Sequence, residues 1–287
     1  MVDHVHKAFF TTDPNAWHRR MGHLNFKQMR KLQDKVGGLL QGAKLEHKHC
    51  EVCLECKMAR KPFPSAHPLE LVLSDIMGPS PTPTFGGCRY LLTFVDDYSR
   101  KISAFILKTK GETYEKFKIF RAMAEVQSGH KIKVLRTHNK KEYKSNAFEK
   151  FQQVFCFVHQ TTCVHTPQQN GEAERVNRTN VDMARCLLFE SGLDKRFWDA
   201  SLMCAIYIRN RCPTAALNGK IPEERWSEKS ISLDHLTIFG SIAYVLIPKE
   251  KRKKWDPKSK TMVFIGYSEE VSKAYRFMDP DNPLVLW

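Results

Sequence analysis

The chain has 287 residues, and its apolar and charged fractions are those of an ordinary globular protein, which excludes wholesale disorder. Lys and Arg number 46 against 31 Asp and Glu, so the formal net charge is +15 at pH 7. This excess favours a polyanionic partner such as DNA or RNA, although a basic surface that serves only solubility gives the same balance.

The sequence carries neither a targeting nor a membrane signal. Residues 1–10 lack the apolar block of a signal peptide, and the apolar stretch at 239–248 is too short to span a bilayer. The nine cysteines are spread along the whole chain, which is typical of a reducing compartment. We therefore expect a protein of the nucleus and cytoplasm that has no membrane partner.

The first segment, residues 1–66, is rich in His, Cys and Lys and ends in a Lys-Pro-Phe-Pro linker signal. His18 and His23 precede the pair Cys50 and Cys53, which has C-x2-C spacing. Two imidazoles and two thiolates form a complete tetrahedral ligand set for a structural Zn²⁺ ion. Because so short a segment has little core, zinc would supply much of its folding free energy.

The zinc assignment leaves two alternatives open. The four residues can instead be scattered surface histidines and reduced cysteines. His47, His49 and Cys56 are also close enough in sequence to replace one of the ligands. The presence of a site is therefore better defined than its ligand set.

The middle of the chain predicts a mixed sheet flanked by helices, from strand-like apolar runs and helical periodicity. In chain order the predicted elements are strands at 69–75, 90–96 and 102–107, a helix at 112–126, a strand at 131–136, a helix at 147–154, a strand at 155–159, and helices at 172–190 and 195–211. Beyond Pro213, short strands at 241–247, 262–267 and 273–277 predict a small β-domain.

Two carboxylates are placed where a metal site could form at one edge of this sheet. Asp75 ends the first predicted strand, and Glu174 lies near the start of a predicted helix. Where such ends converge, two or three carboxylates could hold the paired Mg²⁺ ions that catalyse phosphoryl transfer. Taken singly, each acid is more often a solvated turn residue or a helix cap.

The sequence closely resembles the integrase of copia-type retrotransposons over nearly its whole length. The resemblance is carried by WHRRMGH at 17–23, the Cys50 and Cys53 pair, Ser-Asp with Gly-Pro at 74–79, FVDDYSR at 94–100, PQQNG at 167–171, Ala-Glu-Arg at 173–175, Asn-Arg-Thr at 177–179, Phe-Trp at 197–198, Tyr207 with Asn-Arg at 210–211, Phe-Gly at 239–240 and FIGYS at 264–268. It implies an α/β fold in three domains. These are a small helical zinc-binding pre-integrase module (1–66), a ribonuclease-H-like core with a mixed five-stranded sheet (67–215) and an SH3-like β-domain (216–287).

The family is part of a Pol polyprotein that also contains a protease and a reverse transcriptase. Neither is found in this chain, so we expect a polyprotein fragment whose last domain is truncated. The chain could equally come from a gene model built on transposon debris.

In this family two Asp and one Glu hold the catalytic metal ions, with a fixed spacing between the second Asp and the Glu. Asp75 matches the first and Glu174 the last, and the same spacing counted back from Glu174 ends at His138. Mg²⁺ prefers oxygen ligands, whereas a neutral imidazole offers one nitrogen and no charge. Lys140 and Lys141, which replace two glycines of the family pattern, add positive charge beside the cation site.

The resemblance thus implies an integrase-like protein whose ancestral reactions are metal-dependent 3′-end processing and strand transfer by a DDE-type polynucleotidyl transferase. We expect catalysis to be impaired, with a structural Zn²⁺ and a catalytic Mg²⁺ or Mn²⁺ that is weakened or lost. Ligation of Mn²⁺ by His138, or replacement by Glu142, would preserve some activity. The alternative is a non-catalytic, zinc-containing nucleic-acid-binding protein from a decayed or host-retained element.

Two basic surfaces are candidates for DNA contact. The first comprises Lys251, Arg252, Lys253 and Lys254. Trp255 follows them and could stack on bases, although a solvated loop with a buried Trp255 is the alternative. Arg175 and Arg178 follow Glu174 on a helix that in the family lies along the DNA. We expect a homo-oligomer that binds element ends and target duplex in a salt-dependent, sequence-tolerant way.

Overall fold

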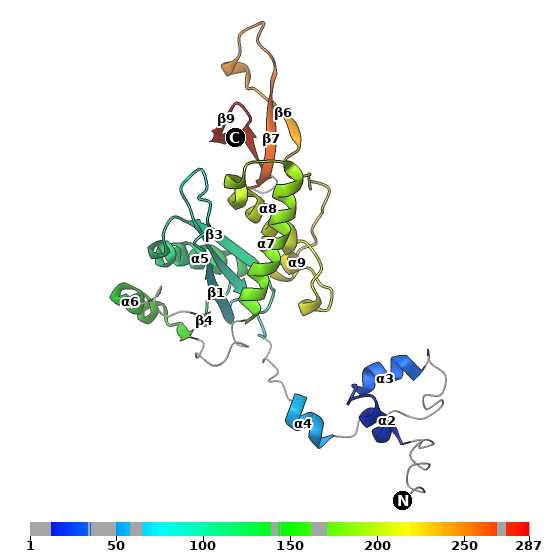
Figure 1. Cartoon of the computed structure of the whole chain (residues 1–287). Helices are drawn as coiled ribbons and strands as arrows, with labels where there is room; N and C mark the ends of the chain where they lie inside the picture. The colour runs from blue at the N-terminus through cyan, green and yellow to red at the C-terminus, as the bar shows by residue number, and fades with distance from the viewer. Residues whose placement is uncertain are drawn as a thin grey trace, which may run out of the picture. The chain divides into compact units, whose positions relative to one another are not determined.

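The computed structural model describes residues 13–33, 35, 50–57, 65–138, 143, 145–161, 171–268 and 274–286 (Figure 1). The chain divides into two compact units, Met1–Phe63 and Pro64–Trp287, and each is treated by itself. None of the helices in the described part combines the length and the apolar composition that a bilayer span would need. The domain boundaries at 66 and 215 remain predictions.

The described part of the first unit contains three short helices. They are α2 (Pro14–Arg20), α3 (Phe26–Gln33) and α4 (Glu51–Lys57). Asp13 caps α2 by accepting the Asn15 backbone N–H, and Pro14 occupies the first turn, where no backbone donor is needed. Among the described residues of this unit, Phe26 and Met29 are the buried apolar residues of its core. So small a core cannot by itself offset the entropy of ordering three helices.

The second unit is built on a five-stranded mixed sheet with the order β3-β2-β1-β4-β5. The strands are β1 (Leu71–Met77), β2 (Tyr90–Asp96), β3 (Ile102–Leu107), β4 (Val134–Thr137) and β5 (Val158–Thr161). The first three form an antiparallel meander, and β4 and β5 run parallel to β1. β1 is therefore paired along both edges, which fixes its position firmly.

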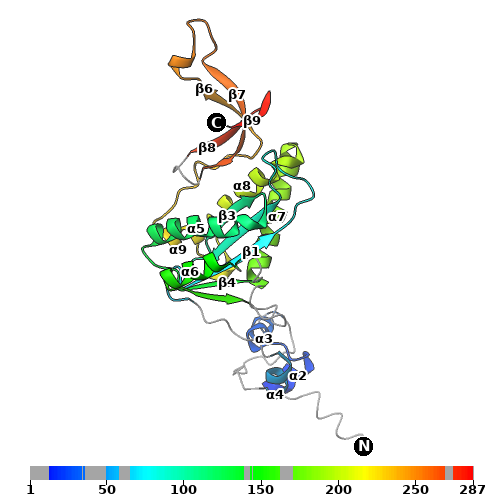
Figure 2. The same cartoon turned by 90° about the vertical axis from the view of Figure 1, so that its left-hand side faces the viewer.

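Helices cover both faces of this sheet (Figures 1 and 2). They are α5 (Thr113–Ser128), α6 (Asn146–Phe155), α7 (Gly171–Ser191), α8 (Trp198–Asn210) and α9 (Pro222–Ser227), with short 3-10 turns at Lys110–Glu112 (η1), Lys195–Phe197 and Ala215–Leu217. On one face, Phe117 of α5 and Phe148 of α6 pack with Phe94 of β2. On the other face, Ala173 of α7 and Leu202 of α8 belong to one core with Leu73 and Val95.

Side chains of β1 alternate between these two faces, as the period of a strand requires. Val72 packs in the core on the α5 side, and Leu73 packs on the α7 side. Asp75 comes two residues after Leu73 and therefore lies on the α7 side. Ser74 lies on the opposite side, where its hydroxyl is hydrogen-bonded to the Tyr143 hydroxyl at 2.9 Å.

A second sheet follows α9, with the order β6-β7-β8-β9 and antiparallel pairing throughout. Its strands are β6 (Ile242–Leu246), β7 (Ser259–Tyr267), β8 (Tyr275–Asp279) and β9 (Asn282–Leu286), with a 3-10 turn, η6 (Lys249–Lys251), between the first two. The sheet packs on α8, where Phe264 and Tyr267 join one core with Cys204 and Tyr207. Gly266 has φ 138, a backbone conformation that residues with a Cβ rarely adopt, so glycine suits this position.

The mixed five-stranded sheet with flanking helices is confirmed, and the differences from the predicted elements have local causes. The strand predicted at 155–159 is displaced, because α6 continues to Phe155 and Cys156 turns the chain with φ 51. The first strand begins at Leu71 because Leu69 has φ 63, which does not fit a strand. The helix predicted at 195–211 begins as a 3-10 turn, and α9 and β9 are absent from the predicted elements.

Candidate functional site

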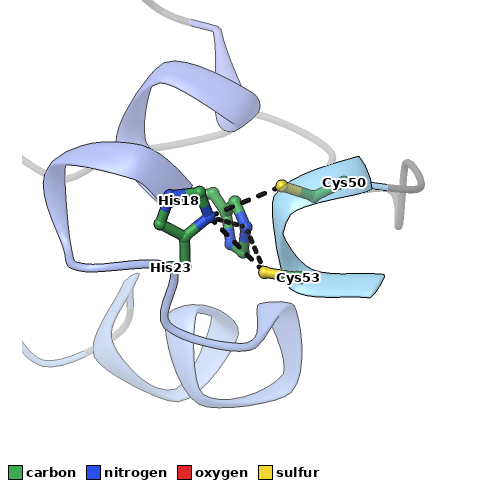
Figure 3. A group of neighbouring side chains, drawn as sticks. All are labelled: His18, His23, Cys50 and Cys53. Carbon is green, nitrogen blue, oxygen red and sulfur yellow. Dashed lines mark hydrogen bonds between the residues drawn. The ribbon is translucent and has the colours of Figure 1, made fainter. Parts of the chain in front are cut away.

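Four side chains of the first unit converge on one point (Figure 3). His18 lies on α2, His23 in the turn after it, and the two cysteines at the start of α4. His18 Nε2 is 3.2 Å from Cys53 Sγ, His23 Nδ1 is 3.4 Å from Cys50 Sγ, and all four candidate ligand atoms lie within 4.8 Å of one another. Bonds of about 2.0–2.3 Å to a tetrahedral Zn²⁺ ion separate its ligands by about 3.3–3.8 Å. The four groups therefore fit one zinc ion.

The local backbone orients both imidazoles toward this point. His18 Nδ1 donates to the Leu24 carbonyl at 2.8 Å, which leaves Nε2 for the metal. Gly22 and His23 adopt left-handed conformations, and the His23 N–H donates to the His18 carbonyl at 2.8 Å. Desolvation and the neighbouring Cys50 raise the pKa of the Cys53 thiol, an effect that a bound dication would reverse.

The described geometry also bears on the alternative zinc ligands. Cys56 is exposed and does not belong to the converging group. His47 and His49 lie outside the described residues.

The second candidate site lies at the carboxyl ends of β1 and β4. The two strands pair in parallel with Ser74 opposite Thr137, so Asp75 and His138 follow side by side on one face. α7 lies on this same face and carries Glu174 in its first turn. His138 Nδ1 is 4.0 Å from Glu174 Oε1. The fold thus brings Asp75, His138 and Glu174 together, with His138 beside Asp75, where the family pattern has its second Asp.

Asp75 is held by two polar residues that are not among the predicted site residues. Asn177 Nδ2 donates to Asp75 Oδ2 at 2.9 Å, and Thr93 Oγ1 donates to Asn177 Oδ1 at 3.0 Å. Asn177 and Thr93 are both buried, so these bonds are shielded from water. Two signals for Asn177 are present in the sequence: it belongs to the Asn-Arg-Thr motif at 177–179, and it lies one helical turn after Glu174, on the same side of α7.

The electrostatics of this edge suit a cation. Burial raises the pKa of the Asp75 carboxyl above its ordinary value, the Asn177 hydrogen bond lowers it, and the negative charge of Glu174 raises it. The side chains of His138 and Glu174 are 57% and 49% exposed, so the site is open to solvent. A buried carboxylate beside a solvent-accessible acid is an arrangement that a bound cation would stabilise.

A small pocket lies next to Asp75 and His138. Its volume is about 70 Å³, and Ser74, Tyr143 and Lys110 also line it. A cavity of this size holds ions and a few water molecules, each of which takes about 30 Å³ in the liquid, but no organic ligand. Of the other residues discussed for this site, Lys140, Lys141 and Glu142 lie outside the described residues.

The two basic surfaces differ in how their side chains are presented. Arg175 and Arg178 are exposed on α7 beside Glu174. In the β6–β7 connection the lysines are exposed, whereas Arg252 is half-buried and its Nε has no hydrogen-bond partner among the described residues. The exposed lysines include Lys251, Lys253 and Lys254. Trp255 is 90% exposed, so the alternative of a buried Trp255 is wrong.

Models of three protein families match three successive parts of the chain. Residues 3–58 match the GAG-pre-integrase domain, residues 65–167 the integrase core domain, and residues 241–285 the retroviral polymerase SH3-like domain.

Curated relatives are similar over most of this chain. The retrovirus-related Pol polyprotein from transposon TNT 1-94 of Nicotiana tabacum is 41% identical over 278 residues, which are 95% of this chain and 21% of the relative. The corresponding polyprotein from transposon RE1 of Arabidopsis thaliana is 29% identical over 88% of this chain and 18% of the relative. The chain thus spans about a fifth of the length of these relatives.

A solved structure is also similar to part of this chain at low identity. The HTLV-2 integrase catalytic core domain in complex with magnesium is 19% identical, with a TM-score of 0.44 over 56% of this chain and 98% of that one.

Removal of zinc is expected to unfold the first unit. Cys50→Ser, or treatment with a chelator, should abolish the binding of one zinc ion and reduce the helical circular dichroism signal, because metal binding offsets a core too small to fold alone. Cys56→Ser, on the same helix but outside the ligand group, is the matched control and should retain its zinc. Metal content measured by atomic absorption, together with the dichroism spectrum, checks this. Retained helicity after chelation would contradict the zinc assignment.

Asp75→Asn is expected to stabilise the second unit at neutral pH. Because burial raises the pKa of Asp75, the folded chain binds this proton more tightly than the unfolded chain, and stability falls as the pH rises through the folded-state pKa. Removing the charge should therefore raise Tm at pH 7.

The difference in Tm between Asp75→Asn and the unmodified protein is measured by calorimetry of the zinc-loaded proteins without other divalent ions. This difference should shrink as the pH is lowered toward 4. Asp182→Asn removes an exposed carboxylate from α7 and serves as control. A Tm that falls at pH 7 on substitution of Asp75 would mean that the Asn177 hydrogen bond outweighs burial.

Proposed function

We propose that the chain is the integrase region of a retrotransposon Pol polyprotein, and that it is an integrase-like protein that binds DNA but is impaired in catalysis. Its ancestral reactions are 3′-end processing and strand transfer by a DDE-type polynucleotidyl transferase. The observation that carries the proposal is the placement of His138 beside Asp75 and within 4.0 Å of Glu174.

The residues at this edge do not fit the paired Mg²⁺ ions that such a reaction uses. Asp75 and Glu174 supply oxygen ligands, but His138 supplies neither a second oxygen nor a negative charge. A shared carboxylate is what allows two cations to be held about 3.5–4 Å apart in two-metal sites. Impaired strand transfer in Mg²⁺ follows from this ligand set.

Two features support DNA binding independently of catalysis. Arg175 and Arg178 are exposed on α7 next to the carboxylate edge, so a phosphate backbone that approaches Glu174 would meet them. The β6–β7 connection presents Lys253 and Lys254 beside the exposed ring of Trp255. Cationic side chains around an exposed aromatic ring suit contacts to phosphates with stacking on a base. By analogy with the family, we propose a homo-oligomer that binds element ends and target duplex.

The alternative function is a zinc-containing protein that only binds nucleic acid. The exposed basic connection around Trp255 favours it, because this surface does not depend on the carboxylate edge. Under this alternative the rest of the catalytic surface has also decayed, and restoring one ligand would not restore a reaction.

Reversion of His138 separates the two functions. In a strand-transfer assay on a labelled duplex with the element's terminal sequence, His138→Asp should be on the order of 10²–10³-fold more active in Mg²⁺ than the unmodified protein, the effect of restoring several kcal/mol of transition-state stabilisation. His138→Asp combined with Glu174→Gln should be silent. The same proteins should bind the duplex with similar affinity in Mn²⁺ and in Mg²⁺, and more weakly at higher salt.

The outcomes distinguish the proposals. Equal activity of the unmodified protein and the revertant would overturn impairment and make His138 a working ligand. Silence of the revertant with DNA binding retained would favour the binding-only function. Loss of DNA binding in all proteins would contradict both.

A further inference from the structure

We propose that a groove between α7, α8 and the β1–β2 connection is a docking site for an acidic amphipathic helix of another protein. The two helices lie side by side on one face of the five-stranded sheet (Figures 1 and 2). The groove has a volume of about 850 Å³ and is lined by the last residue of β1, the C-terminal half of α7 and the start of α8. It shares no residue with the carboxylate edge or the basic surfaces, so binding there requires neither the proposed DNA binding nor strand transfer.

The lining of the groove is mainly apolar. Half-buried apolar side chains come from every wall, namely Met77, Leu188, Leu193 and Trp198. The volume lies in the range of about 300–1,000 Å³ that is typical of pockets for ligands with several apolar groups. Phe189 also lines the groove, and its side chain is 90% exposed. A ligand that covers this ring would remove a large apolar surface from water.

Hydrogen bonds hold the β1–β2 connection in place as one wall of the groove. The Trp198 indole N–H donates to the Thr82 carbonyl at 2.9 Å. The Arg89 guanidinium donates to the Ser80 and Pro81 carbonyls at 3.0 and 3.2 Å. The groove is therefore formed before a ligand arrives, which lowers the free energy that binding would otherwise spend on ordering a loop.

The rim of the groove is positively charged. Arg89, Arg185 and Lys195 line it and are exposed, and none of the described residues that line the groove is acidic. Arg185 is paired with Asp182 at 2.8 Å, but both side chains are more than half exposed. Such a pair contributes little, so a carboxylate of a ligand can replace Asp182. A ligand that combines carboxylates with apolar side chains matches the groove in both charge and polarity.

The length of the groove along α7 suits a short helix. From Val181 to Phe189, which both line the groove, the axis of α7 rises by about 12 Å. Apolar side chains at positions i and i+7 of a docked helix are about 10.5 Å apart along its axis. Helices that bind in grooves use this spacing for their apolar anchors, with polar residues toward the rim.

Two other occupants match the groove less well. A second copy of this chain, bound through the same face, would bring the three rim cations of both copies together on chains whose formal net charge is +15 each. A DNA backbone would satisfy the rim cations, but its phosphates and sugars offer little apolar surface to the lining. The combination of rim and lining therefore favours an acidic amphipathic segment of a protein.

The test uses the full zinc-loaded chain and designed, fluorescein-labelled peptides. The probe is a helical peptide with leucines at i, i+3, i+4 and i+7 and glutamates beside them. A scrambled peptide of the same composition lacks the apolar stripe, and a third peptide has lysines in place of the glutamates. Binding is measured by fluorescence anisotropy. We expect the acidic amphipathic peptide to bind about tenfold more tightly than either of the others.

Two substitutions at the groove should each weaken binding of the acidic peptide about fivefold or more. Phe189→Ala removes an apolar contact, and Lys195→Glu reverses a rim charge. The matched controls are Val126→Ala and Lys131→Glu, which make the same kinds of change at exposed positions outside the groove and should leave binding unchanged. Because all four side chains are exposed, each variant should keep its Tm, which calorimetry checks.

Three results would overturn this docking site. The first is equal binding of the scrambled or the lysine peptide, or binding that neither Phe189→Ala nor Lys195→Glu weakens. The second is self-association of the chain without peptide that sedimentation shows to be lost with Phe189→Ala, which would assign the groove to a second copy. The third is displacement of the peptide by duplex DNA together with weaker DNA binding by Phe189→Ala, which would assign the groove to nucleic acid.

Discussion

The parallel pairing of β1 with β4 is the constraint on which the second unit's chemistry depends. With Ser74 opposite Thr137, the next residues of both strands, Asp75 and His138, lie adjacent on the face covered by α7. A shift of one residue in this register would move one of the pair to the opposite face and separate them. The buried apolar residues on both faces of β1 fix the register, so the geometry of the edge is set by the core and not by the site residues themselves.

The two candidate metal sites of the chain follow different physical rules. In the first unit the core is small, and the four ligands form a closed set that suits a structural ion. In the second unit the cores on both faces of the sheet are large, so we expect the carboxylate edge to tolerate a change of ligand without loss of structure. This difference explains how His138 can occupy a ligand position in an otherwise well-packed sheet. A substitution in the zinc set would instead remove the folding free energy of its unit.

Local sequence signals predict most of the strands and the long helices. They fail where the structure depends on a single backbone conformation or on distant partners. The run from Phe155 to Val158 is aromatic and β-branched, so it favours a strand, yet the left-handed Cys156 ends a helix in the middle of it. Asn177 and Asp75 are 102 residues apart, and only the packing of α7 on the sheet makes them partners. The spacing that identifies position 138 could be read from the sequence, whereas its 4.0 Å approach to Glu174 could not.

The central claim is that the side chain at position 138 decides which ions this edge holds. Crystals of the unmodified protein and of the His138→Asp variant, each soaked in Mn²⁺ and measured for anomalous scattering, test it most directly. We predict two manganese peaks about 3.5–4 Å apart between Asp75, position 138 and Glu174 in the variant, as in two-metal sites, and at most one in the unmodified protein. Two peaks of equal occupancy at this edge of the unmodified protein would contradict the account.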